Sequence, residues 1–237
     1  MTHLEIDASQ AENLARLAIF LLGADGESVS LVTEQSVDQA SIAVLSGAEA
    51  KEATPYPPGD LAIWVFILAE LLVFAVFFAS YAFTRMNHVE LFNQYQATLD
   101  RDAALINTLA LLTSSYFVVR AVAAVRKGDN RLCARWLWAG VGMGAVFLLV
   151  KAVEYAHHIG AGVSLSTNTF YMFYLSLTFF HFMHVIMGMV ILAAVAMKAG
   201  REGYSVRNHT GVETGASYWH MVDLVWLILF PLVYVMQ

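Results

Sequence analysis

Five long apolar stretches, separated by short polar segments, dominate the hydrophobic pattern of the chain. Each stretch is close to the ~20 residues that a helix needs to cross the hydrocarbon core of a bilayer. The apolar runs are continuous, which excludes the alternating strands of a membrane β-barrel and leaves helices as the spanning structure. The pattern therefore predicts an all-α polytopic membrane protein with a bundle of five transmembrane helices. The predicted spans are 61–83, 103–125, 132–156, 170–197 and 216–236.

A different kind of segment precedes these spans. Residues 1–60 contain ten Asp or Glu and only two basic residues. Ser9 and Glu12 match a capping box that would open a short helix, and three prolines follow just before the first span. The acidic start argues against a secretory signal. We therefore expect residues 1–57 to be an acidic cytoplasmic tail, with marginal helices or disordered, and residues 58–237 to form the membrane domain.

The distribution of basic residues predicts the orientation of the spans, because short cytoplasmic loops carry an excess of Lys and Arg. The basic residues gather in and beside the second and fourth loops, whereas the third loop and the C-terminus have none. We therefore expect a multi-pass protein of a bacterial inner membrane, with a cytoplasmic N-terminus and a periplasmic C-terminus. The basic residues that set this orientation are Arg120, Arg126, Lys127, Arg131, Arg135, Lys198, Arg201 and Arg207.

Composition supports the membrane assignment and excludes several function classes. Of the 237 residues, 59% are hydrophobic and 14% are charged, whereas an ordinary soluble domain has about 25% charged residues. The single cysteine, Cys133, cannot form an intrachain disulfide or a cysteine-based metal site. The sequence contains no phosphate loop, nucleophile elbow or dinucleotide fingerprint. We expect no catalytic, cofactor-binding or metal-binding residue on the chain, and no nucleic-acid partner.

Ionisable side chains inside the spans are the strongest candidates for a site, because they are costly in hydrocarbon. Glu70 lies about 14 Å along the first predicted helix, and His181, His184, His220 and Asp223 fall at a similar depth in the last two. Within each span the polar residues are three apart and share a helix face. We expect a buried polar cluster of these five residues. Its role remains open: hydrogen bonds that fix helix packing on one side, and proton handling or lipid-headgroup binding on the other.

A second polar group is expected near the outer end of the third span. Lys151 and Glu154 are one helical turn apart, so snorkelling and an ion pair can relieve the cost of both charges. Glu154 and His157 also spell Glu-x-x-His, and His181 and His184 spell His-x-x-His. A stand-alone membrane metalloenzyme with metal at these four residues is therefore one alternative function.

A proton-coupled transporter using Glu70 and Asp223 is a second alternative function, for which the sequence suggests no substrate.

Five motifs follow one another along the predicted spans. They are WVFILAELLVF at 64–74, INTLALLTSS at 106–115, KAVEY at 151–155, FHFMHVIMG at 180–188 and YWHMVDLVW at 218–226. In this order they make the chain similar to subunit III of the haem-copper oxidases. The resemblance covers roughly residues 58–237, in a short five-helix form similar to bacterial subunits III and to the E proteins encoded with nitric oxide reductase.

The resemblance implies a non-catalytic accessory subunit of a respiratory oxidoreductase. Such a subunit packs against the haem-bearing catalytic subunit I, which holds the haems with copper or iron, and it supports assembly, stability and proton uptake from the cytoplasmic side. Membrane lipids, including a structural phospholipid, are further expected ligands. Seven-helix members have two additional N-terminal helices in place of the acidic tail. Whether the partner reduces oxygen or nitric oxide stays open at this level.

Overall fold

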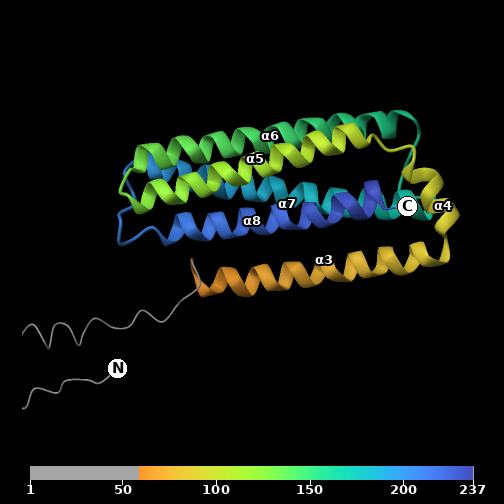
Figure 1. Ribbon diagram of the computed structural model, residues 1–237, viewed down its shortest axis with the longest axis horizontal. Helices are drawn as coiled ribbons and strands as arrows, with labels where there is room; N and C mark the ends of the chain where they lie inside the picture. Colours follow the sequence, from red (N-terminus) through yellow and green to blue (C-terminus); the bar gives the residue numbers. More distant parts are fainter. Residues whose placement is uncertain (1–58, 237) are drawn as a thin grey trace, which may run out of the picture. The chain divides into compact units, whose positions relative to one another are not determined.

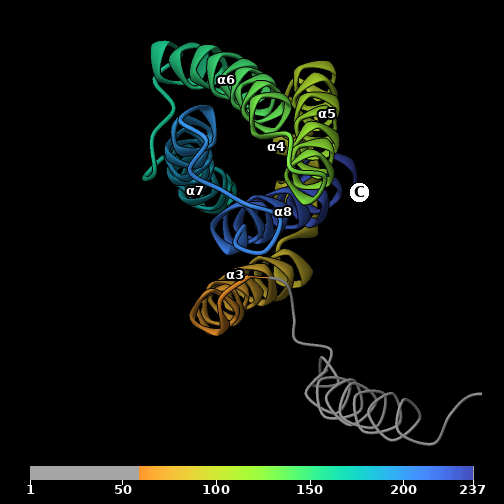
Figure 2. The same cartoon turned by 90° about the vertical axis from the view of Figure 1, so that its left-hand side faces the viewer.

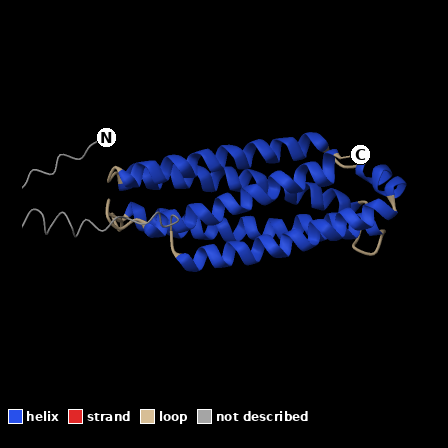
Figure 3. Ribbon diagram, turned by 60° about the horizontal axis from the view of Figure 1, so that its bottom comes forward, coloured by secondary structure: helices blue, strands red, loops and turns tan. Residues whose placement is uncertain are grey.

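The computed structural model describes residues 59–236, in which the regular elements are helices (Figures 1 and 3). Five of them are long and apolar enough to cross a membrane, which confirms the predicted fold class and number of spans. The predictions for the N-terminal tail, including the Ser9–Glu12 capping box, lie outside these residues. The elements are α3 (Leu61–Asn87), α4 (Val89–Gln96), α5 (Arg101–Arg126), α6 (Asn130–Gly160), α7 (Thr169–Gly200), α8 (Thr210–Phe230) and the π-helical turn η1 (Pro231–Val235).

Side-chain caps fix the starts of three of the long helices. Asp100, Asp129 and Asn168 accept hydrogen bonds from backbone N–H groups in the first turns of α5, α6 and α7, at 3.0, 2.9 and 2.8 Å. These bonds satisfy donors that have no partner within the helix. Gly128 ends α5 with φ +82°, a left-handed conformation that glycine adopts without strain. The tight turn that results places α6 antiparallel beside α5.

Helices α5, α6, α7 and α8 form a ring in which each contacts the next, and α3 lies apart from it against α8 (Figure 2). Close approach within the ring depends on small residues. A Cβ atom added at Gly144 on α6 would lie 2.9 Å from Cη2 of Trp219, and one at Gly188 on α7 would lie 2.8 Å from its Cε3. The fully buried indole of Trp219 on α8 therefore fills space that two glycines leave open.

Two features depart from the predicted spans. The first predicted loop contains α4, whose Phe92 and Gln96 are buried where this short helix packs on α7. Its mean hydropathy is low and it has only two turns, so it lacks the apolar run by which the spans were recognised. At the other end, Pro231 interrupts the last span, and the N–H of Met236 donates to its carbonyl at 2.9 Å, an i to i−5 bond. The resulting η1 turn positions Tyr234.

Candidate functional site

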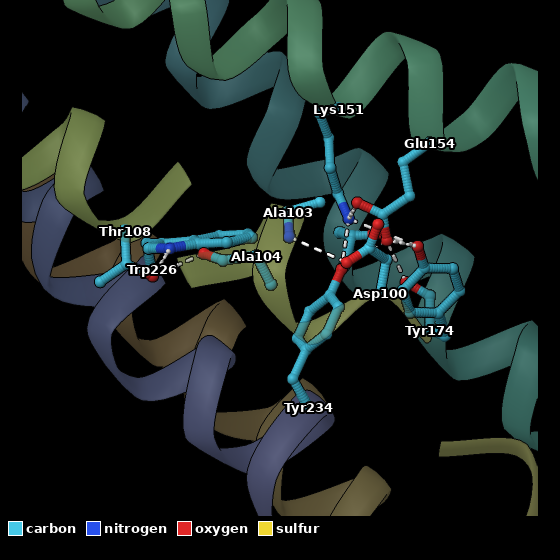
Figure 4. A network of polar contacts seen from close by, with 10 residues as sticks. Asp100, Ala103, Ala104, Thr108, Lys151, Glu154, Tyr174, Trp226 and Tyr234 are labelled. Carbon is cyan, nitrogen blue, oxygen red and sulfur yellow. Dashed lines mark hydrogen bonds and ion pairs between the residues drawn. The ribbon is translucent and has the colours of Figure 1, made fainter. Parts of the chain in front are cut away.

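The most extensive polar network in the described part of the chain surrounds Lys151 on α6 (Figure 4). The ammonium donates to Oε2 of Glu154 at 3.0 Å, to the hydroxyl of Tyr174 at 3.4 Å and to the hydroxyl of Tyr234. Oε1 of Glu154 accepts from the hydroxyls of Tyr234, at 2.9 Å, and Tyr174. All three ammonium protons and both carboxylate oxygens are therefore used, which is the condition for a stable buried ion pair.

The environment of Lys151 corrects one expectation from the sequence. Its side chain is 0% exposed, so the ammonium does not snorkel to the membrane interface. It is instead enclosed by aromatic rings, with Nζ 5.0 Å from the ring centre of Tyr174, 5.2 Å from that of Tyr234 and 5.8 Å from that of Trp226. These rings come from α7, η1 and α8, so the pair joins three elements to α6.

A second polar group joins α3 to the ring of four helices. Oε2 of Glu70 lies 3.1 Å from Nε2 of His184 on α7. Nδ1 of His184 lies 2.8 Å from the carbonyl oxygen of Phe180, and because a carbonyl only accepts, Nδ1 must carry a hydrogen. Nε2 then either donates to an ionised Glu70 or accepts from a protonated one. In both arrangements His184 and Glu70 together carry one more proton than a neutral histidine and an ionised glutamate would.

The other predicted polar residues lie elsewhere. Nδ1 of His220 on α8 lies 2.8 Å from Oγ of Ser115 on α5 and 3.7 Å from Oδ2 of Asp223. His181 is fully buried among aromatic rings, with no hydrogen bond to either ring nitrogen within residues 59–236. Its ring centre is 5.3 Å from that of Trp226.

The structure therefore does not gather the five predicted residues into one cluster. It divides them into the Glu70–His184 pair, the His220–Asp223 pair with Ser115, and the isolated His181. The sequence places all five at similar depth but says nothing of how each helix is rotated about its axis. That rotation directs His184 toward α3 and Asp223 toward α5. The five residues therefore lie at similar depth without all contacting one another.

The proposed metal ligands are also dispersed. Glu154 is engaged with Lys151 and two tyrosines, whereas His184 binds Glu70. Across residues 59–236 no group of three or more His, Cys, Asp or Glu side chains converges in a geometry that could hold a metal ion. His157 faces a separate pocket of about 480 Å³ that also reaches Glu154, His158 and Asp100. The metalloenzyme alternative therefore has no ligand set in this part of the chain.

Several important partners had no signal in the sequence. Tyr174 and Tyr234 complete the Lys151 network, and the hydroxyl of Thr108 on α5 accepts from Nε1 of Trp226 at 2.9 Å (Figure 4). Thr108 and Trp226 both fall inside motifs of the resemblance, yet neither was singled out. Tyr234 is 83 positions from Lys151 and reaches it only because η1 turns the end of the last span inward.

The fold, with the buried Lys151–Glu154 ion pair inside it, defines the class as a polytopic membrane protein with five helical spans. Residues 49–237 match the family model described as cytochrome c oxidase subunit III. The chain belongs to the cytochrome c oxidase subunit III family. As a member of it, the chain is a subunit of an oxidoreductase complex and is not itself the catalyst.

Individual relatives agree with this assignment. The chain is 36% identical over 177 residues to a cytochrome c oxidase subunit 3 of Thermostichus vulcanus, covering 74% of this chain and 86% of the relative. A cytochrome c oxidase subunit 3 of Synechocystis sp. is 32% identical, with 73% of each chain covered. A quinol oxidase subunit 3 of Bacillus subtilis is 27% identical, with 74% of this chain and 86% of the relative covered. These names are those of oxidases, and the nitric oxide reductase alternative gains no support from them.

Proposed function

We propose that the chain packs against the haem-bearing catalytic subunit I of a cytochrome c or quinol oxidase, supports the assembly and stability of that complex, and assists its proton uptake from the cytoplasmic side. The haems, with copper or iron, then belong to the catalytic subunit, and this chain binds none of them. Membership of the subunit III family supports association with an oxidase complex. The polar pairs within the spans support the more specific role.

The single observation that carries the proton role is the Glu70–His184 pair. Its atoms are 3.1 Å apart, it lies about 14 Å along α3, and its hydrogen-bonding pattern requires a proton on one partner or the other. The side chain of Glu70 is 21% exposed, so the pair reaches the outer surface of the bundle, where a neighbouring subunit can contact it. A shared proton at such a position in the middle of a membrane span is suited to transfer and is more than packing requires.

The orientation proposed for the chain is an inner-membrane one with the N-terminus in the cytoplasm. The α5–α6 turn and the α7–α8 loop, in and beside which most of the basic residues are found, lie at the same end of the bundle (Figure 1). An ion pair of 3.5 Å links Arg131, at the start of α6, to Glu202 in the α7–α8 loop. A positive end of this kind favours the cytoplasmic side, which places the end of α8 toward the periplasm.

A lipid site is a further part of the proposal. An apolar groove of about 900 Å³ lies between the C-terminal half of α3, α6 and α7, where Phe77, Tyr155, Ile159 and Phe179 contribute to its lining. Its size and apolar character suit a phospholipid acyl chain. Native mass spectrometry of the purified complex tests this, and a complex that carries no lipid after mild delipidation would contradict it.

The proton role is tested by replacing Glu70 with glutamine and Asp223 with asparagine in the intact complex. The glutamine amide of E70Q can still donate to Nε2 of His184, so helix packing is retained while the titratable proton is lost. We expect normal assembly with lower turnover and faster inactivation. S80A is the matched control, because the exposed Ser80 hydroxyl bonds only to Val76 of its own helix at 2.8 Å. Unchanged turnover and lifetime of the E70Q and D223N complexes, with normal assembly, would refute the proton role.

A further inference from the structure

The outer surface formed by α5 and α8 differs from the rest of the bundle, because a histidine interrupts it in the middle of the membrane. On α8, His220, Leu224 and Leu227 follow one another at helical spacing with exposed fractions of 38% for the His220 side chain, 48% and 44%. On α5, Leu112 and Val119 flank Ser115 by one turn on each side and are 43% and 52% exposed. We call these five exposed residues the α5–α8 face.

The two nitrogens of His220 have different surroundings. Nδ1 is turned inward to Ser115 at 2.8 Å, with Asp223 behind it at 3.7 Å. No hydrogen bond joins Nε2, at the opposite edge of the ring, to any of residues 59–236, and the His220 side chain is 38% exposed. His220 lies ten residues into α8, which puts Nε2 about 15 Å along the span and therefore near the middle of the bilayer.

This arrangement is unfavourable in lipid alone. Acyl chains offer no hydrogen bond, and headgroups lie too far from the middle of the span to reach the ring. Other exposed polar groups in the spans avoid this cost within their own helices: the hydroxyls of Ser80 and Thr113 donate to the carbonyls of Val76 and Leu109, at 2.8 and 2.7 Å. In His220 the nitrogen nearer the backbone, Nδ1, is engaged with Ser115, and Nε2 at the far edge of the ring has no partner within residues 59–236. A polar group of a neighbouring subunit can supply that partner.

We propose that the α5–α8 face is the docking surface for a transmembrane helix of the catalytic subunit, and that a polar side chain of that helix hydrogen-bonds to Nε2 of His220. This inference rests on the proposed function and adds to it the surface and the contact. Leu112, Val119, Leu224 and Leu227 supply the apolar contact around the polar centre. Interhelical hydrogen bonds of this kind fix orientation within a membrane, where apolar packing alone is weakly specific.

Two substitutions separate the outward role of His220 from its inward one. An asparagine amide at this position reproduces Nδ1 and keeps the contact with Ser115, whereas a glutamine amide reproduces Nε2 and keeps the outward contact. The rate at which the chain dissociates from the detergent-purified complex is the measurement. We expect H220Q to dissociate at the wild-type rate and H220N about threefold to tenfold faster. T113V, which removes an exposed hydroxyl bonded to its own helix, should have no effect.

Other outcomes overturn the proposal. Wild-type dissociation of H220N, or loss of the complex in H220Q alone, would mean that only the inward contact with Ser115 matters. Helical circular dichroism and thermal unfolding of each variant expressed alone show whether it folds. If H220N does not fold, photo-crosslinking tests the proposal instead, because it leaves His220 in place.

For crosslinking, a benzophenone amino acid replaces Leu224 on the α5–α8 face or, as the matched control, the 67% exposed Leu149 on α6. We expect a covalent product with the catalytic subunit from position 224 and none from position 149. Product from position 149 and none from 224 would place the partner on another face and overturn this inference, while the proposed function stands. No copurifying catalytic subunit with either variant, nor with the wild-type chain, would contradict the proposed function itself.

Discussion

Replacing Glu154 by glutamine would leave the Lys151 ammonium buried without an anion. The Lys151 side chain is 0% exposed and that of Glu154 is 5% exposed, so water cannot hydrate the ammonium in place of the lost carboxylate. The remaining acceptors would be the hydroxyls of Tyr174 and Tyr234 and the new amide oxygen, all of them neutral. Removing one member of a buried ion pair costs about 3–5 kcal/mol. We therefore expect E154Q to lower the free energy of unfolding by about 3 kcal/mol or more.

The assay is reversible unfolding of the purified chain in mixed micelles, followed by circular dichroism. K151M combined with E154Q should be less destabilised than E154Q alone, because the uncompensated charge is then gone. E202Q is the control, since Glu202 pairs with Arg131 on the surface at 3.5 Å, with both side chains mostly exposed, and should change little. If E154Q unfolds within about 1 kcal/mol of the wild type, the ion pair is not the buried, fully bonded unit described above.

Two further predictions concern the packing of α8. T108V removes the acceptor for Nε1 of Trp226 and should cost about 1–3 kcal/mol, because a buried indole N–H then has no partner; stability equal to the wild type would contradict this. G188A brings a Cβ atom to 2.8 Å from Trp219 and should cost about 1–3 kcal/mol. G142A, where nothing lies within 4 Å, should be neutral or slightly stabilising, and equal thermal unfolding of both alanine variants would refute the close approach.

The sequence was sufficient for the number and approximate position of the spans, because a continuous apolar run has few alternatives in a membrane. It missed α4, whose two turns carry the mixed polarity of a loop. It identified Glu70 and His184 as polar residues at similar depth, and these two do meet. It could not separate His181 from them, because the rotation of each helix about its axis depends on packing across the whole bundle.

The surroundings of Lys151 could not be predicted from the sequence either. Spacing alone places Lys151 and Glu154 on one helix face. The aromatic enclosure that keeps the ammonium from the interface comes from three other elements, and one of its rings is carried by the π-helical turn at Pro231. Contacts between residues this distant in sequence have no local signature. Snorkelling was expected because the sequence shows the length of a lysine side chain but not what surrounds it.

We propose that this chain works as a non-catalytic subunit beside a haem protein. Affinity purification of the tagged full-length chain from native membranes checks this, with a reduced-minus-oxidised spectrum of the eluate and of the chain purified alone from a host that lacks the complex. We expect haem bands in stoichiometric amount with the catalytic subunit from native membranes, and none from the isolated chain. A native eluate without haem or any catalytic subunit, or haem bound to the isolated chain, would refute the proposal.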